Sequence, residues 1–411
     1  MLRGFAFRPT SRGWQALAAG AAVLAVARLV GTTQLHQLAY LLLLLVAAAL
    51  ALGAAGLAGL GFERRLPEGG RITAGRPAGV ELVLHNRSRL LWTSRLEVED
   101  VLARRESAAL PPLPPGRRRR ARLSATFPRR GVYRLGPAVV RGVDPFGLLV
   151  FSRAFRGEDE VVVYPRVHPL RGFPVRGGEA QAGSRGSRGR RGEEFAGLRE
   201  YRRGDDRRHI HWKSLARTGE LFVKEFALHA PRSYTVALDL RRGGFRSLEA
   251  AVEDAVSAAA SILAHLREEG LGFRLLCTDR AGSGTEAGEG HAAYWEAMRV
   301  LAGVRADGEA GLGEALDGED RGSFGDGVIL VCRREEEGLR ARVRRLREAG
   351  LAVVAVLVAE HTYRGGAAQP GPEARFSSFA SGLEAAGARV LVVRHPEGVA
   401  GLGGGPARGA V

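Results

Sequence analysis

The stretches SYTVALDL (Ser233–Leu240), VILVC (Val328–Cys332) and LAVVAVLVA (Leu351–Ala359) determine the fold of the C-terminal half of this chain. Each is a short apolar run, which is typical of a strand that is buried on both faces. Between them lie helical patterns, such as the apolar stripe of Leu248–Glu269. Alternating strands and helices predict a doubly wound α/β domain with a mostly parallel sheet over residues 227–395. We expect residues 396–411, which are rich in glycine, to form a flexible tail.

The two cysteines of the chain, Cys277 and Cys332, stand at the ends of two such strand-like runs. With one strand between them they lie about 10 Å apart at the usual strand spacing of ~4.8 Å, which is too far for a disulfide. We therefore expect buried, reduced thiols, as in a cytosolic domain. The strand Ser233–Leu240 is followed by no glycine-rich fingerprint, so a Rossmann dinucleotide site is discounted.

The segment Glu193–Phe226, EEFAGLREYRRGDDRRHIHWKSLARTGELFVKEF, precedes this domain and holds both lysines of a chain with 61 Lys plus Arg. An ammonium and a guanidinium are not interchangeable, so lysines retained among so many arginines indicate a geometric demand. The pattern predicts a short helix over Asp206–Arg217, with an aspartate as N-cap and Gly219 near its end.

Two further regions lie upstream of this segment. Residues 168–192 are rich in Gly, Ser and Arg and have no hydrophobic periodicity, which predicts a linker. Residues 62–167 read as short, alternating β segments separated by turn residues, which is the pattern of an antiparallel β-sandwich.

The N-terminal region predicts a two-helix transmembrane hairpin over residues 14–61. Leu38–Leu60 contains no charge and is long enough for a hydrocarbon core that needs ~20 residues. The weaker apolar run Trp14–Val30 precedes it, and residues 1–13 are expected to form an N-terminal tail. A signal peptide is the alternative, but the second, longer apolar segment and the lack of a clear cleavage context argue against it.

Arginines flank the outer ends of both predicted helices, and the short loop between the helices carries none. By the positive-inside rule, both termini and the soluble domains face the cytoplasm of a bacterial inner membrane. The arginines that carry this prediction are Arg3, Arg8, Arg12, Arg64 and Arg65.

The formal net charge of +17 and the pI of about 11.0 point to an acidic partner, such as nucleic acid, anionic lipid or an acidic protein surface. The alternative is that an arginine-rich composition simply solvates the surface. A nucleic-acid site would use the linker arginines Arg185, Arg188, Arg190 and Arg191. Aromatic residues for base stacking are absent around them, so we regard nucleic acid as an improbable partner.

The motifs REY (Arg199–Tyr201), GD (Gly204-Asp205), IHW (Ile210–Trp212) and ART (Ala216–Thr218) resemble the signature of the bacterial family called domain of unknown function 58. The upstream runs RRGVYRLGP, DPFGLL and VVVYPRV fit the same family. The resemblance implies a membrane-anchored protein with an immunoglobulin-like module and a von Willebrand factor A-like domain. It also implies a partner, a MoxR-type AAA+ ATPase.

Von Willebrand factor A domains hold a hard cation through an Asp-x-Ser-x-Ser motif after the first strand. Here the matching positions are Asp239, Arg241 and Gly243, so only the aspartate is retained. We expect a degenerate metal site, with Asp239 paired to an arginine and no cofactor bound.

The segment Glu193–Phe226 also offers acid–base candidates, and a hydrolase using Asp205 and His211 is the enzymatic alternative. His209 and His211 are about 200° apart around a helix, so they are badly placed to share one metal ion. The non-enzymatic interpretation is that charge-assisted hydrogen bonds and a buried Trp212 hold this segment together, or that it is a docking surface. We expect the binding residues to be Arg199, Tyr201, Asp205, His211, Trp212, Lys213, Arg217 and Lys224.

Overall fold

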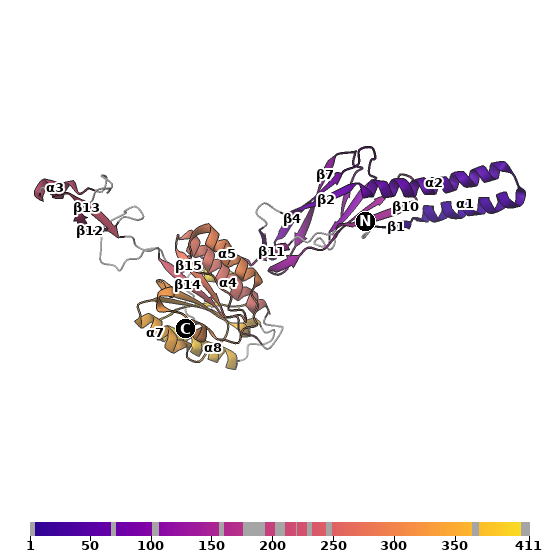
Figure 1. The fold of residues 1–411 in the computed structure, drawn as a ribbon. Coiled ribbons are helices and arrows are strands. Elements are labelled where there is room, and N and C mark those ends of the chain that lie inside the picture. The colour runs from indigo at the N-terminus through magenta and orange to yellow at the C-terminus, as the bar shows by residue number, and fades with distance from the viewer. Residues whose placement is uncertain are drawn as a thin grey trace. The chain divides into compact units, whose positions relative to one another are not determined.

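The structure is a computed structural model that describes residues 5–66, 71–100, 107–155, 160–175, 194–201, 210–218, 220–227, 232–243, 249–363 and 370–403. The chain divides into two compact units, the first ending at Arg166 and the second beginning at Val167, apart from a short piece of one helix. Figure 1 shows the elements of both units along the chain.

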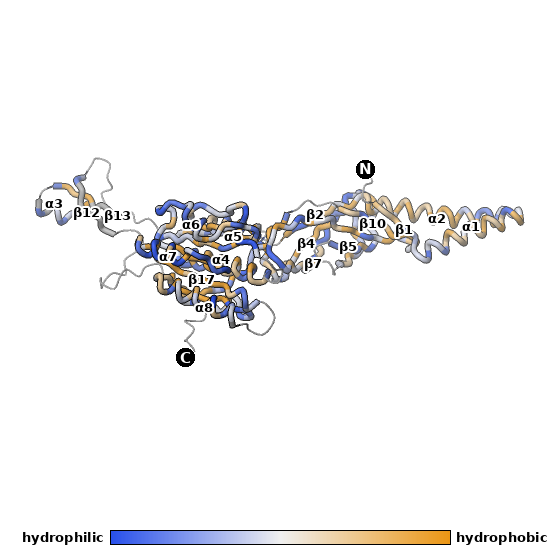
Figure 2. Tube along the Cα trace, turned by 90° about the horizontal axis from the view of Figure 1, so that it is seen from below, coloured by the Kyte–Doolittle hydropathy of each residue, from blue (hydrophilic) through white to orange (hydrophobic). Residues whose placement is uncertain are grey.

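The first unit begins with a strand and two long helices, β1 (Phe5–Pro9), α1 (Ser11–Val30) and α2 (Thr33–Ala58). Both helices are long and apolar enough to cross a membrane by length and composition. Figure 2 shows their hydrophobic character as a nearly continuous orange tube. Most of their large apolar side chains are exposed, while small residues such as Ala27 and Ala39 are fully buried. Small buried residues allow two helix backbones to approach closely.

Strand β1 corrects the prediction of an N-terminal tail over residues 1–13. Phe5–Pro9 pairs antiparallel with β10 and forms the edge of that sheet, so this part of the chain is held by a backbone ladder. Thr10 then caps α1, because its hydroxyl accepts a hydrogen bond from the Gly13 amide at 3.0 Å.

The β strands of the first unit form three sheets, ordered β1-β10-β9-β5-β6, β2-β4-β7 and β3-β11-β8. All pairings are antiparallel except the short parallel pair of β3 and β11. One hydrophobic cluster draws buried residues from all three sheets, including Leu82, Val98 and Val163. The strands span β2 Leu60–Arg65, β3 Ile72–Thr73, β4 Pro77–Asn86, β5 Leu96–Asp100, β6 Ser107–Leu110, β7 Arg118–Thr126, β8 Gly131–Arg134, β9 Ala138–Val143, β10 Leu149–Phe155 and β11 Glu160–Tyr164.

The helices and the strands of this unit are joined at the base of the helical pair. The Arg153 guanidinium donates to the backbone carbonyls of Leu57, Ala58 and Leu60 at 2.8, 2.8 and 2.9 Å. Leu57 and Ala58 end α2, where a cation is favourable, and Leu60 begins β2. Gly53 faces the Phe151 ring, which an added Cβ would meet at 2.1 Å, so glycine permits this close approach.

The second unit contains a five-stranded, fully parallel sheet of order β15-β14-β16-β17-β18. Helices α4 and α5 cover one face, and α7 and α8 cover the other (Figure 1), as right-handed crossovers on both sides of β14 require. The elements are β14 Ser233–Leu238, α4 Glu249–Glu268, β15 Gly272–Cys277, α5 Gly290–Gly303, α6 Leu312–Asp317, η3 Arg321–Phe324, β16 Gly327–Cys332, α7 Leu339–Glu348, β17 Ala352–Val358, η4 Glu360–Tyr363, α8 Pro370–Ala385, β18 Arg389–Val393 and η5 Gly398–Gly403.

Two segments that we predicted to be flexible pack against this domain. In the predicted linker 168–192, the His168 amide donates to Ser261 of α4 at 2.9 Å, and Phe173 and Val175 are buried. The prediction is therefore wrong for residues 168–175, where apolar side chains cover α4, while residues 176–192 lie outside the described ranges. In the predicted tail 396–411, Val399 and Leu402 are buried, so residues 398–403 are part of the core.

Cys277 and Cys332 are buried free thiols at the ends of β15 and β16, with β14 between these strands. This is the arrangement that the strand order in the sequence predicts.

Candidate functional site

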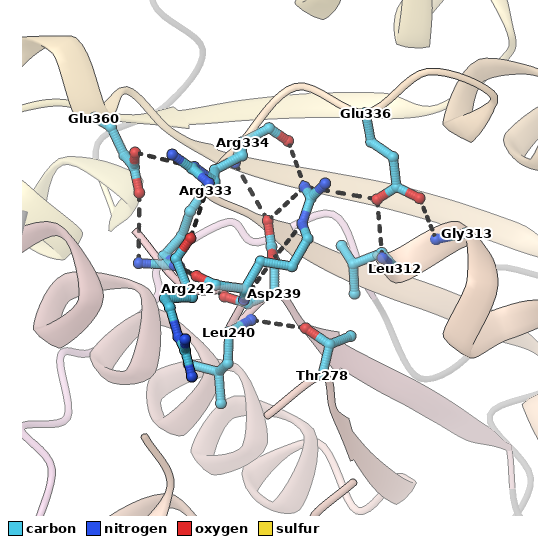
Figure 3. Close-up of polar contacts among 11 residues, drawn as sticks. Asp239, Leu240, Arg242, Thr278, Leu312, Gly313, Arg333, Arg334, Glu336 and Glu360 are labelled. Carbon is cyan, nitrogen blue, oxygen red and sulfur yellow. Dashed lines mark hydrogen bonds and ion pairs between the residues drawn. The ribbon is translucent and has the colours of Figure 1, made fainter. Parts of the chain in front are cut away.

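The carboxyl ends of the parallel strands meet in a dense cluster of charged side chains, which we call the edge cluster and which consists of Asp239, Arg241, Arg333, Arg334, Glu336 and Glu360 (Figure 3). Strand β14 lies where the chain's crossovers change direction, because its neighbours β15 and β16 follow it on opposite sides. In open α/β sheets, ligands bind outside the carboxyl ends of the strands at such a point. The edge cluster therefore occupies the usual position of a ligand site.

Asp239 is the centre of the edge cluster and is fully buried. Its Oδ1 accepts hydrogen bonds from the backbone and from Nε of Arg241, both at 3.0 Å. Its Oδ2 accepts from Nη2 of Arg241 at 2.9 Å and from the Arg334 amide at 3.3 Å. The bidentate guanidinium occupies the side of the carboxylate where a cation would otherwise bind.

Arg333 follows β16 and links the ends of β14 and β17 to it. Its buried guanidinium donates Nε to the Asp239 carbonyl at 2.9 Å and Nη2 to the Arg241 carbonyl, and its Nη1 lies 3.4 Å from Glu360. Arg334 lies 3.8 Å from the same glutamate and donates to the Arg242 carbonyl at 3.0 Å. Each of these arginines thus satisfies backbone carbonyls that the strand ends leave without a sheet partner.

Glu336 completes the edge cluster and fastens helix α6 to it. Its carboxylate accepts the backbone amides of Leu312 and Gly313 at 2.9 and 2.8 Å and lies 3.6 Å from Arg241. A Cβ on Gly311 would meet this carboxylate at 2.5 Å, so the absence of a side chain lets the glutamate reach the helix start.

The charges in the edge cluster stabilise one another. Burial would raise the pKa of Asp239, but the hydrogen bonds and charge of Arg241, with the charge of Arg333, outweigh burial and hold that pKa below its usual value. Burial lowers the pKa of the Arg333 guanidinium, and burial also raises the pKa of the neighbouring Cys332 thiol. Cys332 is therefore a protonated, unreactive thiol.

The edge cluster is filled by its own ion pairs and hydrogen bonds, and a cavity lies beside it. Among the residues that the structure describes, no group of three or more His, Cys, Asp or Glu side chains is placed to hold a metal ion. A cavity of about 380 Å³ opens beside the edge cluster, and its walls include Arg333, Arg334, His361 and Arg375. Glu335 and Glu360 also line this cavity, so its walls carry charges of both signs.

The second candidate site is the segment Glu193–Phe226, of which the structure describes three pieces. Strands β12 (Glu194–Glu200) and β13 (Phe222–Ala227) pair antiparallel, and helix α3 (Trp212–Thr218) lies in the segment that connects them. The predicted helix from Asp206 to Arg217 is wrong at its start. Ile210 forms a β-bridge with Val223, and the His211 amide donates to the Phe222 carbonyl at 2.8 Å, so the helix cannot begin before Trp212.

The predicted binding residues separate into two groups on this hairpin. Arg199 and Lys224 occupy adjacent register positions, because Arg199 pairs with Val223 and Lys224 pairs with Leu198. Tyr201 is half-buried and follows β12, where its amide donates to the Leu221 carbonyl at 2.9 Å. Asp205 lies outside the described residues, as do Asp206 and His209.

The remaining predicted residues lie at or on α3. His211 precedes the helix, and its Nδ1 is 2.8 Å from the Ser214 hydroxyl, a local contact that braces the first turn. Trp212, Lys213 and Arg217 are exposed, and 62% of the Trp212 surface is accessible. The expectation of a buried Trp212 is therefore wrong, because the helix is a single, short element that presents its first residue to solvent.

Sequence analysis missed Arg333, Arg334, Glu336 and Glu360 as site residues. The signal was present in the run CRREEEG, which follows a buried strand directly and so begins at the carboxyl edge of the sheet. The three glutamates of this run follow its two arginines directly, so the loop carries its own balancing charges.

Comparison with known proteins finds one family whose match covers most of the second candidate site and part of the edge cluster. Residues 197–333 match the family described as "Protein of unknown function DUF58". That range contains the end of β12, all of α3 and β13, and the sheet up to Arg333. No curated protein matches the chain. Among solved structures, the CARDB domain of a Pyrococcus furiosus protein, in complex with two metal ions, aligns with 13% identity over 23% of this chain and 85% of that one, with a TM-score of 0.17.

Proposed function

We propose that this chain is a membrane-anchored, non-enzymatic docking or scaffold protein that works with a MoxR-type AAA+ ATPase in the assembly or remodelling of a complex. The observation that carries the proposal is the exposed face of α3, with Trp212, Lys213 and Arg217. Tryptophan and arginine are the residue types most enriched at the energetic centres of protein interfaces. An exposed tryptophan beside two cations fits an acidic surface with an apolar pocket.

The anchor in this proposal is the helical pair α1 and α2. Their exposed apolar side chains need a non-aqueous environment, and their lengths suit a bilayer. By the positive-inside rule, the arginines outside the helices support a topology with both ends and the two soluble units in the cytoplasm of a bacterial inner membrane.

The two soluble units take finer assignments from the family resemblance. We propose that the antiparallel strands of the first unit form an immunoglobulin-like sandwich and that the parallel sheet of the second is von Willebrand factor A-like. Asp239 supports the second assignment, because it stands at the end of the first strand of the sheet. In this chain, Arg241 supplies the positive charge at that carboxylate from within the protein.

The test is affinity purification from native membranes in mild detergent, comparing the wild type with the double variant Trp212→Ala and Lys213→Ala. We expect the wild type to recover an AAA+ ATPase and the double variant to lose it. The matched control is Arg344→Ala with Arg345→Ala, which removes two exposed cations from α7. This control should retain the ATPase.

Two results would overturn the proposal. Recovery of the same ATPase by the double variant would remove α3 from the docking surface. Absence of any ATPase from the wild-type sample would remove the partner. The wild type, the double variant and the control must have equal melting temperatures, so that loss of the ATPase reports a lost contact and not unfolding.

A further inference from the structure

The loop between β4 and β5, residues Arg87–Arg95, displays two large apolar side chains to solvent. Leu90 is 86% exposed and Trp92 is 62% exposed, although both follow a strand whose residues are largely buried. An isolated exposed leucine is ordinary, but a leucine and a tryptophan on one tight loop form an apolar tip. Phe146, on the neighbouring turn between β9 and β10, is also exposed.

Buried polar groups hold this loop in its shape. The fully buried Asn86 side chain donates to the carbonyls of Leu91 and Leu113 at 2.8 and 3.0 Å and accepts the Ser88 amide at 3.0 Å. Thr93 is buried as well, and its hydroxyl accepts the Leu113 amide at 2.8 Å. The exposure of the apolar tip is therefore built into the fold, since its flanks are fixed by satisfied hydrogen bonds.

The loop lies against the last turn of α2. The Arg87 amide donates to the Gly59 carbonyl at 2.8 Å, and a Cβ on Gly56 would lie 3.6 Å from the Trp92 carbonyl. A crevice of about 190 Å³ runs between the loop and the helix, and its walls include Leu52, Leu57 and Trp92. The apolar tip is thus continuous with the apolar surface of the helical pair.

The length of α2 sets the depth of this crevice in a bilayer. The helix has 26 residues, which at 1.5 Å per residue is about 39 Å, against a hydrocarbon core of about 30 Å. About 9 Å of the helix must extend beyond the core or be taken up by tilt. The loop contacts the last turns of α2, so it lies at the level of the lipid headgroups, the depth that tryptophan prefers.

The charges around the loop match that depth. Arg87, Arg89 and Arg95 are exposed on both sides of the apolar tip, and Arg8 and Arg12 are exposed at the start of α1. Guanidinium groups beside an apolar tip are suited to bind the phosphates of an anionic lipid surface.

We propose that the loop Arg87–Arg95 is a membrane-interface contact of the first soluble unit, in which Leu90 and Trp92 enter the boundary between headgroups and acyl chains and the flanking arginines bind anionic phospholipid. This inference rests on the proposed membrane anchor. It goes further, because it ties the β-strand unit to the bilayer surface at a second point. The contact would add to the hydrogen bonds by which Arg153 already joins the strands to the end of α2.

The four tryptophans of the chain allow a direct test. Full-length protein with Trp92 as its single tryptophan (Trp14→Phe, Trp212→Phe, Trp295→Phe) is reconstituted into vesicles of phosphatidylcholine and phosphatidylglycerol with brominated acyl chains. We expect strong quenching by bromines near the headgroups, weaker quenching by bromines near the bilayer centre, and weak quenching by aqueous acrylamide. Unquenched Trp92 fluorescence with every brominated lipid would overturn the inference, as would quenching confined to acrylamide.

Two further single-tryptophan proteins separate this inference from the anchor itself. The Trp14 protein should be quenched by brominated lipid if α1 crosses the membrane, and the Trp295 protein, whose tryptophan lies on α5, should not be quenched. Quenched Trp14 with unquenched Trp92 contradicts the interface contact alone. Unquenched Trp14 contradicts the membrane anchor and the contact together.

The arginines are tested in the Trp92 protein with Arg87→Ser, Arg89→Ser and Arg95→Ser. We expect lipid quenching to fall at least twofold in vesicles containing phosphatidylglycerol and to change little in phosphatidylcholine alone. An equal, undiminished signal in both vesicle types would remove anionic lipid from the proposal.

Discussion

The edge cluster and helix α3 both carry positively charged side chains, but they use them in opposite ways. In the edge cluster, Arg241 and Arg333 are directed at a buried carboxylate and at backbone carbonyls, so their charge is consumed within the fold. On α3, Lys213 and Arg217 are exposed beside Trp212. The net charge of +17 therefore does not measure the charge that is available to a partner, because burial and ion pairing determine how much of it is accessible.

The largest expected effect on stability comes from Arg241→Ala. This change leaves the fully buried Asp239 without its bidentate partner, and breaking a buried pair on one side costs about 3–5 kcal/mol. The free energy of unfolding of the second unit is measured by denaturant titration, followed by Trp295 fluorescence in the single-Trp295 background described above. Arg241→Lys is the matched control, because it keeps the charge but loses the planar fork, and it should lie between wild type and Arg241→Ala.

An unchanged unfolding midpoint in Arg241→Ala would contradict the statement that the charge of Arg241 is used within the fold. It would mean that Arg333 alone compensates Asp239 and that Arg241 is free to serve a partner.

The second prediction concerns pH. The folded-state pKa of Asp239 lies below the ordinary value of 3.8 for an aspartate, so its ionised form stabilises the fold above that pH. This stabilisation is lost as the pH falls through the depressed folded-state pKa. The stability difference between wild type and Asp239→Asn should therefore be constant above about pH 5 and should narrow below 3.8. Denaturant titrations of both proteins between pH 3 and pH 7 give the difference, and a gap that widens toward low pH would contradict the assignment.

A smaller effect is expected for Glu336→Gln, about 1–2 kcal/mol. The amide keeps one acceptor oxygen for the start of α6 but loses the second acceptor and the charge near Arg241. Amide hydrogen exchange at Leu312 and Gly313 is the sensitive measurement, and both should exchange faster in the variant. Glu337→Gln, on the next residue, is the control and should leave exchange at α6 unchanged.

The order of elements follows from sequence patterns, but the sites do not. The apolar runs Ser233–Leu240 and Val328–Cys332 predict parallel strands because burial on both faces requires continuous apolar sequence. The same logic predicts the apolar helices of the first unit. It also correctly places one strand between Cys277 and Cys332.

The errors arose where tertiary contacts override local composition. Phe5–Pro9 is a strand because β10 offers it an open edge, and no local pattern reveals that partner. Residues 168–175 look like the start of a flexible linker, yet Phe173 is buried against His265 of α4, with ring centroids 5.6 Å apart. The edge cluster is hidden for the same reason, because Asp239 and Arg333 are 94 residues apart in sequence and meet only through the parallel pairing of β14 and β16.

The smallest expected effect on stability is that of Trp212→Ala. This variant tests most directly whether α3, unlike the edge cluster, presents its side chains to solvent. Because Trp212 is 62% exposed at the start of a short helix, its removal should change the free energy of unfolding by less than about 0.5 kcal/mol. A buried core tryptophan would instead cost about 3–5 kcal/mol. Thermal unfolding of full-length protein in detergent, followed by circular dichroism, distinguishes the two outcomes. A variant of near-wild-type stability that has lost its ATPase partner would show that Trp212 serves binding. A strongly destabilised variant would show that Trp212 is a core residue. The cavity beside the edge cluster would then be the remaining candidate for the docking surface.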